Sequence, residues 1–377
     1  MIIGFDAKRA TANFTGLGNY SRYIIDSLAC QCPEHSLRMY IPKIYDNAAY
    51  DKLLTHSNVI SCKPDTRRGL IAPALWRIGG INSQLKRDSI DIFHGLSNEI
   101  PFGIERSGIA SVVTIHDLIF LRYPKFYKPI DRVIYNTKFR YACNHARRII
   151  AVSDCTKRDI VKFYNINPDK IDVIHQNCHP IFSQKLPLHD VNRVKMAYNL
   201  PDKFMLYVGT IETRKNALLA IKALPHIDPS MHMIIIGRKT PYINELYSYI
   251  NNNKLNNRVR FIHDMDLTDL PAMYHMARIF VFPSRYEGFG IPILEALTSG
   301  TPVIAATGSC LEEAGGPSSI YIDPDDTKGM IDAINAILTN ESLRYRMKND
   351  GLNYIQRFDN TQMVQSLLNT YDKARNQ

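Results

Sequence analysis

Short apolar runs rich in β-branched residues alternate with amphipathic stretches of helical length along all 377 residues of the chain. Continuously apolar strands separated by helices are typical of parallel sheets that helices cover on both faces. The sequence therefore predicts a doubly wound α/β architecture. The predicted strands are Ile2–Phe5, Arg38–Ile41, Asp91–Phe93, Ala110–Ile115, Arg148–Val152, Ile171–Ile174, Phe204–Val208, His232–Ile236, Val259–Ile262, Ile279–Phe282 and Pro302–Ala305.

The proline-rich stretch 177–202 has the weakest periodicity, so we expect the boundary between two domains there. The prediction is an N-terminal Rossmann-like domain over 1–182 and a second one over 183–360, facing each other across a cleft. A helix over 361–377 is expected to pack back towards the first domain. Ligands of such open sheets bind beyond the carboxyl ends of the strands.

The net charge of +10 is unevenly distributed. Residues 1–185 contain 26 basic and 16 acidic side chains, whereas residues 186–377 contain 20 of each. A basic half is compatible with a nucleic acid, with an anionic membrane or with a phosphate-bearing acceptor, and charge alone does not separate these partners. No apolar run approaches the ~18 residues of a membrane span, and the seven cysteines lack metal-like spacing, so we expect a cytoplasmic protein with reduced thiols.

The segment from Phe282 to Ala305 carries the strongest functional pattern. A predicted strand runs into a glycine-containing loop and then into a helix with Pro292 near its start, an arrangement that presents backbone N–H groups to an anion. Glu287 and Glu295 flank that position, and carboxylates suit the hydroxyl groups of a sugar or a ribose. The pattern therefore indicates a nucleotide-sugar site, and the alternative is an ordinary strand–loop–helix with a solvated Glu and a capping Glu.

Arg214 and Lys215 follow a second predicted strand, Phe204–Val208, which runs into Gly209. A bidentate guanidinium beside an ammonium is suited to hold a diphosphate. The alternative is an exposed basic pair at a helix start, although cations there oppose the helix dipole.

The N-terminal half offers weaker signals. Gly16 and Gly18 precede a predicted helix over Ser21–Ala29, but the full dinucleotide pattern is absent, so a plain loop remains an alternative to a phosphate loop. His116 stands at the end of a predicted strand, where it could contact a sugar hydroxyl or serve only as a structural residue. The sequence shows no GxSxG, HExxH, Walker or metal-ligand pattern, so neither a metal nor another cofactor is expected.

Taken together, these segments resemble the retaining GT-B glycosyltransferases of family 4, also called group 1. Glu287 and Glu295 match the Glu-x7-Glu motif of that family, and Tyr207–Asn216 is similar to its YVGxxExRKN stretch. The resemblance spans roughly the whole chain, and the His-Asp-Leu and RKN forms are most similar to a mannosyltransferase-B-like subgroup. Thr213 departs from the Pro of many relatives, which affects loop stiffness rather than chemistry.

The resemblance implies a role for each matched residue. Arg214 and Lys215 would hold the donor diphosphate, Glu295 the ribose, and Glu287 and His116 the transferred sugar. Backbone groups of Gly290, Ile291 and the Gly16–Gly18 turn would also contact the donor, which is a substrate rather than a cofactor. Retention in this family is assigned to attack on the face from which the phosphate departs, so neither a protein nucleophile nor a metal is required.

The expected function is thus transfer of a hexose, with GDP-mannose the favoured donor, to a glycan or polyprenyl-diphosphate-linked acceptor in surface polysaccharide synthesis. A sugar-nucleotide isomerase or glucan phosphorylase of the same fold, and a basic nucleic-acid-binding protein, are the alternatives, and no nucleic-acid pattern supports the last. The basic and apolar segment 63–87, with Arg67, Arg68, Trp76, Lys86 and Arg87, predicts peripheral binding to the inner face of the cell membrane.

Overall fold

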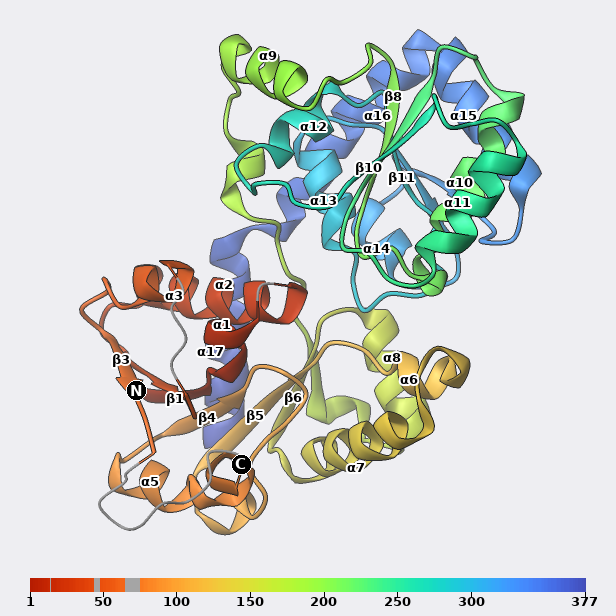
Figure 1. Ribbon diagram of the computed structural model, residues 1–377. Helices are drawn as coiled ribbons and strands as arrows, with labels where there is room; N and C mark the ends of the chain where they lie inside the picture. The colour runs from red at the N-terminus through yellow and green to blue at the C-terminus, as the bar shows by residue number, and fades with distance from the viewer. Residues whose placement is uncertain (14, 44–47, 65–74) are drawn as a thin grey trace. The chain divides into compact units, whose positions relative to one another are not determined.

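A computed structural model describes residues 1–13, 15–43, 48–64 and 75–377 (Figure 1). The chain forms two compact units. The first unit consists of residues 1–176 together with 358–377, and the second consists of residues 177–357. The sequence placed these divisions a few residues further along, after 182 and after 360.

A parallel sheet of seven strands forms the centre of the first unit, in the order β3-β2-β1-β4-β5-β6-β7. The sheet grows outwards in both directions from β1 and β4, which is the doubly wound arrangement. Its strands are β1 (Ile2–Asp6), β2 (Ser36–Tyr40), β3 (Val59–Cys62), β4 (Ile92–Gly95), β5 (Ala110–Ile115), β6 (Arg148–Ala151) and β7 (Ile171–Val173).

Helices cover both faces of this sheet, and each face has its own apolar core. One core joins the sheet to α2 and α17, and the other joins it to α5, α7 and α8. The helical segments of this unit are α1 (Lys8–Ala12), α2 (Gly16–Gln31), α3 (Ala48–Leu53), η2 (Trp76–Gly80), α5 (Asn82–Arg87), η3 (Ile104–Arg106), α6 (Ile119–Arg122), η4 (Pro124–Phe126), α7 (Pro129–His145), α8 (Asp154–Tyr164), η5 (Pro168–Lys170) and α17 (Asn360–Arg375).

The last helix, α17, belongs to the first unit although it ends the chain. Figure 1 shows it in blue among the red and orange elements of that unit. Asp359 caps its first turn by accepting a hydrogen bond from the Gln362 N–H at 3.0 Å. Leu367, Tyr371 and Ala374 are fully buried against the sheet, so α17 completes one of the two cores.

The second unit is built on a parallel sheet of six strands in the order β10-β9-β8-β11-β12-β13. Its two central strands are β8 and β11, so the strand order reverses between them. The strands are β8 (Phe204–Val208), β9 (His232–Ile236), β10 (Val259–Ile262), β11 (Ile279–Phe282), β12 (Val303–Ala306) and β13 (Ile320–Ile322).

Helices pack around the second sheet in the same way. The helical segments are η6 (Pro180–Ser183), α9 (Leu188–Ala197), η7 (Thr213–Lys215), α10 (Ala217–Ala223), η8 (Leu224–His226), α11 (Ile243–Asn252), α12 (Leu270–Met276), α13 (Ile291–Thr298), α14 (Leu311–Gly315), α15 (Thr327–Thr339) and α16 (Glu341–Tyr354), followed by η9 (Ile355–Phe358) at the junction with the first unit. The fold prediction of two doubly wound parallel-sheet domains is therefore confirmed.

Three local predictions need correction. The edge strands β3 and β13 were not among the predicted strands, because each is short and partly exposed and lacks a continuous buried run. Helix α2 begins at Gly16 rather than at Ser21. Gly16 and Gly18 therefore lie inside its first turn and not in a loop before it.

Candidate active site

Three of the residues predicted to bind the donor, Arg214, Lys215 and Glu287, lie on two loops of the second unit. One loop follows β8 and includes η7, which carries Arg214 and Lys215. The other follows β11 and carries Glu287. Because β8 and β11 are neighbours in the sheet, both loops leave its carboxyl edge at the place where the strand order reverses.

The side chains of these loops form one charged cluster. Glu287 Oε1 lies 2.9 Å from Lys215 Nζ and 3.0 Å from Arg214 Nη1, and it also accepts a hydrogen bond of 2.7 Å from Ser284 Oγ. The three charged side chains are only 13–14% exposed. The cluster places two cations side by side, and such a pair suits a diphosphate.

Glu287 is ionised within this cluster. Burial opposes its ionisation, but the Arg214 and Lys215 cations and the hydrogen bonds from Lys215 and Ser284 outweigh that effect and lower its pKa to about 2. Arg214 is also held by Glu212, 2.6 Å away, and donates to the Tyr286 carbonyl oxygen. The guanidinium and the carboxylate are thus fixed before any ligand arrives.

The loop that carries Glu287 leads into α13 through Gly290. Gly290 has a φ of +123°, a region that favours glycine, and it directly precedes Ile291, the first residue of α13. Pro292 has no N–H group and the Ile293 N–H donates to the Gly290 carbonyl oxygen at 2.9 Å, so in the first turn the N–H of Ile291 is the group that could meet an anion. Cys310 secures this loop, because its thiol lies 3.0 Å from the Glu287 carbonyl oxygen and 2.8 Å from that of Phe289.

Glu295 lies further along α13 and has a different environment. Its Oε2 accepts a hydrogen bond of 2.7 Å from the Tyr274 hydroxyl. Burial raises the pKa of Glu295 to about 7, and the hydrogen bond from Tyr274 only partly opposes this effect. The structure therefore brings Arg214, Lys215 and Glu287 into direct contact, whereas Glu295 is bound to Tyr274, and its raised pKa places it between its neutral and charged forms near pH 7.

The predicted glycines of the first unit differ from each other. Gly16 is exposed, and a Cβ at this position would meet no atom within 4 Å. Gly18 is buried, and a Cβ there would overlap the Asn13 carbonyl oxygen. Gly18 is thus required by the close approach of two backbone segments, whatever its role in donor binding.

His116 is buried at the carboxyl end of β5. Burial lowers its pKa to about 4, against a smaller opposing effect of the Leu96 carbonyl, so the ring is neutral near pH 7. Its Nε2 is 2.9 Å from the Leu96 carbonyl oxygen and donates to it, which leaves Nδ1 as an acceptor. His116 can therefore accept a hydrogen bond from a sugar hydroxyl but is unsuited to act as a cation.

His94, which lies in β4, has a structural role. Its Nδ1 lies 2.8 Å from the Tyr371 hydroxyl of α17, and its Nε2 lies 2.8 Å from Thr114 Oγ1. Thr114 in turn contacts the Tyr20 hydroxyl at 2.9 Å. Both ring nitrogens are used within this buried network, which links α17 to β4, β5 and α2.

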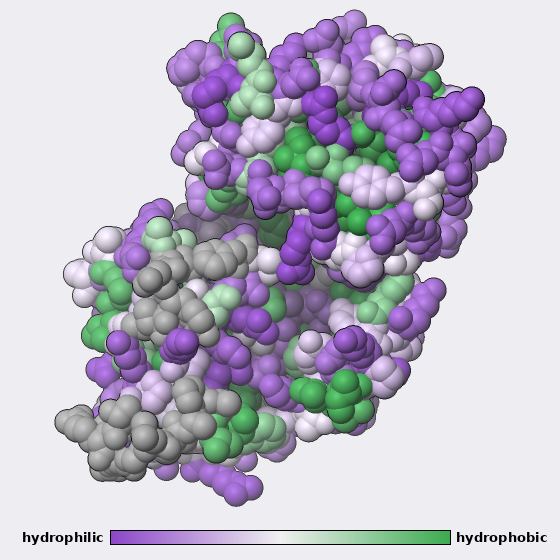
Figure 2. All heavy atoms as spheres, viewed as in Figure 1, coloured by the Kyte–Doolittle hydropathy of each residue, from purple (hydrophilic) through white to green (hydrophobic). Residues whose placement is uncertain are grey.

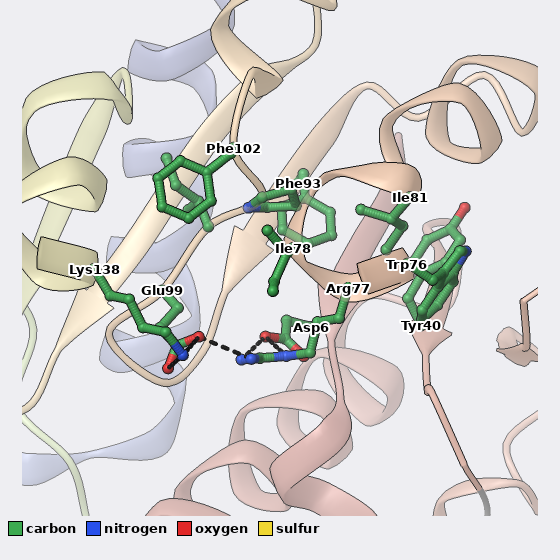
Figure 3. A pocket seen from close by; sticks show the side chains of 12 residues that line it. Asp6, Tyr40, Trp76, Arg77, Ile78, Ile81, Phe93, Glu99, Phe102 and Lys138 are labelled. Atoms are coloured by element: carbon green, nitrogen blue, oxygen red, sulfur yellow. Dashed lines mark hydrogen bonds and ion pairs between the residues drawn. The ribbon is translucent and has the colours of Figure 1, made fainter. Parts of the chain in front are cut away.

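Arg77 belongs to a second charged cluster, shown in Figure 3. Its guanidinium lies 2.5 Å from Asp6 Oδ2 and 2.8 Å from Glu99 Oε2, and Lys138 contacts the same Glu99 oxygen at 3.3 Å. Asp6 ends β1, so this cluster lies at the carboxyl edge of the first sheet. Arg77 lies within the segment 63–87 for which the sequence predicts membrane binding, but its ion pairs with Asp6 and Glu99 hold its guanidinium inside the fold.

The apolar residues of the same segment are divided between the core and the surface, where Leu75 and Ile78 are exposed. Trp76, Ile81 and Leu85 are at most 3% exposed and belong to the core between the sheet and α5. Arg67 and Arg68 lie outside the described residues, whereas Lys86 and Arg87 are exposed. Trp76 is therefore not available for the predicted membrane contact, which stays a prediction for the exposed residues of this segment.

A separate group of side chains could hold a metal ion. The ligand atoms of Asp26, Cys30 and His56 lie within 4.8 Å of one another in the first unit. None of these residues belongs to the cluster around Glu287. Within the described parts of the chain, no helix is both long enough and apolar enough to cross a bilayer.

Comparisons with known proteins match both units. The family described as glycosyltransferase family 4 matches residues 16–176, and the family described as glycosyl transferases group 1 matches residues 190–353. The O-antigen chain mannosyltransferase B of Escherichia coli is 28% identical over 95% of this chain and 96% of its own length. The O-antigen chain mannosyltransferase RfbU of Salmonella typhimurium is 29% identical over 68% of each protein.

Among solved structures, Anabaena Alr3699/HepE in complex with UDP and glucose has a TM-score of 0.74 at 19% identity, over 98% of both chains. This likeness supports the GT-B architecture expected from the sequence. The two family matches together span most of the chain, and the gap between them includes the division between the two units along the sequence. The chain belongs to the family 4, or group 1, glycosyltransferases.

Proposed function

We propose that this glycosyltransferase moves mannose from GDP-mannose, with retention of configuration, to a glycan or polyprenyl-diphosphate-linked acceptor of a surface polysaccharide. The observation that carries the proposal is the cluster of Arg214, Lys215 and Glu287 beside the start of α13, within the group 1 unit. The choice of mannose is supported by the names of the two enterobacterial relatives, both O-antigen mannosyltransferases. UDP in the Anabaena structure belongs to a more distant neighbour.

Arg214 and Lys215 would act on the donor diphosphate. Both cations contact Glu287, and a diphosphate would share them with that carboxylate. In the reaction the bond between the sugar anomeric carbon and the phosphate oxygen breaks, and the acceptor oxygen forms the new bond from the same face. The acceptor proton passes to the departing phosphate oxygen, and the two cations stabilise the charge that develops on the diphosphate.

The remaining residues would orient the donor. Glu287 is ionised and can accept hydrogen bonds from the hydroxyls of the transferred sugar. Glu295 would accept hydrogen bonds from the ribose, which requires its carboxylate form. His116 would contribute Nδ1 as an acceptor, and backbone N–H groups of Gly290, Ile291 and the Gly16–Gly18 turn would contact phosphate or sugar oxygens.

Metal independence is part of the proposal. Two cations and a helix N-terminus can offset the charge of a diphosphate without a divalent ion. We expect full activity after treatment with EDTA. Loss of activity with EDTA and its recovery with Mg²⁺ or Mn²⁺ would contradict this part.

The direct test is an assay of the purified protein with GDP-mannose, UDP-glucose and other nucleotide hexoses. We expect release of free GDP together with an extended acceptor, and NMR of the product should show the α-anomer of the donor preserved. Lys215→Ala is the matched inactive control. Rearrangement of the nucleotide sugar without GDP release would favour an isomerase, and a product of inverted configuration would exclude the retaining mechanism.

A further inference from the structure

Helix α7 presents apolar side chains to solvent in its N-terminal half. Ile130 is 64% exposed, Val133 is 62% exposed and Ile134 is 42% exposed. Their spacing of three and four residues places them in one stripe along the helix. Aliphatic residues of a helix that packs on a sheet normally face the core, so this stripe needs an explanation.

The orientation of α7 is fixed by packing on its other side. Its buried residues are Phe139, Ala142 and Cys143, all in the C-terminal half. Tyr135 packs against Phe139 and Phe120, with ring centroids 5.9 Å apart in each case. The aliphatic stripe therefore cannot turn inwards without loss of these aromatic contacts.

Apolar surface continues beyond α7 within the same unit. The ring of Phe102 lies 4.2 Å from that of Tyr141 in α7, and the Phe102 N–H donates to the Ile78 carbonyl oxygen at 2.6 Å. Phe102, Ile78 and the adjacent Leu75 are all exposed. Figure 2 shows hydrophobic residues gathered in patches on the face of this unit that it draws.

Cations surround the stripe. Residues 124–145 include five basic side chains and a single acid, Asp131. Lys125 and Lys128 precede the stripe and Arg140 follows it, and all three are exposed. Besides Asp131, two carboxylates of this unit are engaged, because Glu99 pairs with Lys138 and Arg77 and Glu105 accepts a hydrogen bond from Tyr141.

We propose that this α7 surface, formed by Lys125, Lys128, Ile130, Val133, Ile134 and Arg140, binds the surface of an anionic lipid bilayer. The aliphatic side chains insert between the headgroups and the cations contact lipid phosphates. The proposal deepens the proposed function, on which it rests for the lipid-linked acceptor. It also moves the membrane contact from residues 63–87 to a different element.

Charge favours a bilayer over a second copy of the chain. Two copies that associate symmetrically through α7 would bring the same patch face to face. Lys125, Lys128 and Arg140 of one copy would then approach the same cations of the other. An anionic bilayer offers both apolar depth and opposite charge.

Co-sedimentation of the full-length protein with vesicles tests the proposal. Vesicles of phosphatidylcholine alone are compared with vesicles that contain about 30% phosphatidylglycerol. No nucleotide sugar is present, so a failure to bind vesicles is distinguished from a failure of sugar transfer. We expect binding to the anionic vesicles only, weakened by 0.5 M salt. Two triple variants remove the surface. Vesicle binding should fall by roughly tenfold or more in each of them, Ile130→Ser/Val133→Ser/Ile134→Ser and Lys125→Gln/Lys128→Gln/Arg140→Gln.

Matched controls use equivalent surface residues elsewhere. Leu188→Ser/Met196→Ser removes exposed apolar side chains from α9, and Lys254→Gln/Lys328→Gln/Arg346→Gln removes three exposed cations from the second unit. Lys86→Gln/Arg87→Gln tests the segment predicted from the sequence. These variants should bind like wild type, and circular dichroism should show every variant folded.

Three results would overturn the proposal. The first is vesicle binding by the α7 variants that equals that of wild type. The second is the same sedimentation, or none, with neutral and anionic vesicles. The third is a wild-type dimer in light scattering that the Ser variant converts to a monomer, which would show that a second copy covers the stripe.

Discussion

The two units share one architecture but distribute charge in opposite ways. The first unit contains 27 basic and 18 acidic residues, and the second contains 19 and 18. In the nearly neutral second unit, two cations gather in a partly buried cluster at the sheet edge. In the basic first unit, the buried histidines at the sheet edge are held neutral, and exposed cations flank α7.

This difference shows that the position of charge, rather than strand order, separates the roles of the units. A partly buried cation acts strongly on one bound group, because little solvent screens it. Cations on an open surface act weakly and together on an extended partner. The second unit is thus suited to a small anionic ligand and the first to a large anionic surface.

The largest effect is expected from variants that remove the cations of the cluster in the second unit. Arg214→Ala and Lys215→Ala should each lower kcat/KM by about 10²–10³-fold, or roughly 3–4 kcal/mol, because the developing diphosphate charge loses a preorganised partner. Lys195→Ala is the control, since Lys195 pairs with Asp202 on the surface of the same unit. Near-normal kcat/KM in both cluster variants would remove the assignment of a diphosphate site.

The two glutamates of the second unit can be separated next. In the proposed role the Glu287 carboxylate binds the transferred sugar, so Glu287→Gln should reduce turnover about 10–100-fold. GDP binding should be kept, because the neutral amide no longer competes for Arg214 and Lys215. Glu295→Gln should instead weaken GDP binding about tenfold, through the ribose. Calorimetry with GDP and steady-state kinetics measure both effects, and equal losses of affinity would end this division of roles.

The glycines of the first unit sharpen the comparison between folding and function. Gly18→Ala should lower the free energy of unfolding by about 1–3 kcal/mol, because the added Cβ meets the Asn13 carbonyl. Gly16→Ala should stay within about 0.5 kcal/mol of wild type, because the position is open. If the Gly16 turn contacts the donor, Gly16→Ala loses activity without loss of stability; a stable and fully active variant would remove that role.

The units should also respond to pH in opposite directions. The folded-state pKa of Glu295 is raised by burial from 4.5 to about 7, so its stabilising contribution is complete below pH 4.5 and is lost as the pH rises to 7. Burial lowers the pKa of His94 to about 3 and that of His116 to about 4, so their contributions are complete above pH 6.5 and are lost as the pH falls. Between pH 5 and 6.5 the contribution of Glu287 is constant, because its pKa is lowered to about 2.

Raising the pH from 5 to 6.5 should therefore stabilise the first unit and destabilise the second, by about 1.4 kcal/mol per pH unit for each proton involved. Hydrogen exchange followed by mass spectrometry, corrected for intrinsic rates, resolves the units separately. Glu295→Gln should abolish the trend in the second unit alone. Parallel changes in both units would contradict the opposite titration.

The sequence was sufficient for the parts of the fold that local patterns determine. Buried parallel strands such as Phe204–Val208 carry a continuous apolar run, and the Glu287–Glu295 motif identified the loop before α13. The edge strands β3 and β13 lack such a run, since one face of each is only partly covered. Their pairing is determined by the neighbouring strand rather than by their own residues.

Contacts between distant residues explain what the sequence could not show. Arg77 pairs with Asp6, 71 residues away, and Trp76 fills a core, although both lie in a segment whose composition is typical of a surface. Glu295 was predicted as an acceptor for ribose, but its contact with Tyr274 and its raised pKa come from α12 packed beside α13. The exposed stripe of α7 is ordinary in sequence, and only the packing of Tyr135 and Phe139 shows which side faces outwards.

The return of α17 to the first unit has a consequence for synthesis on the ribosome. Residues 1–176 are made before α17, so one of their apolar cores lacks Leu367, Tyr371 and Ala374 until residues 360–375 have been synthesised. At about 5–20 residues per second, the 177–357 segment takes roughly 10–40 s to translate. During that interval the apolar residues that α17 later covers remain exposed on the nascent first unit. Folding of this unit is therefore completed only when α17 has been made, and its exposed apolar surface can bind chaperones until then.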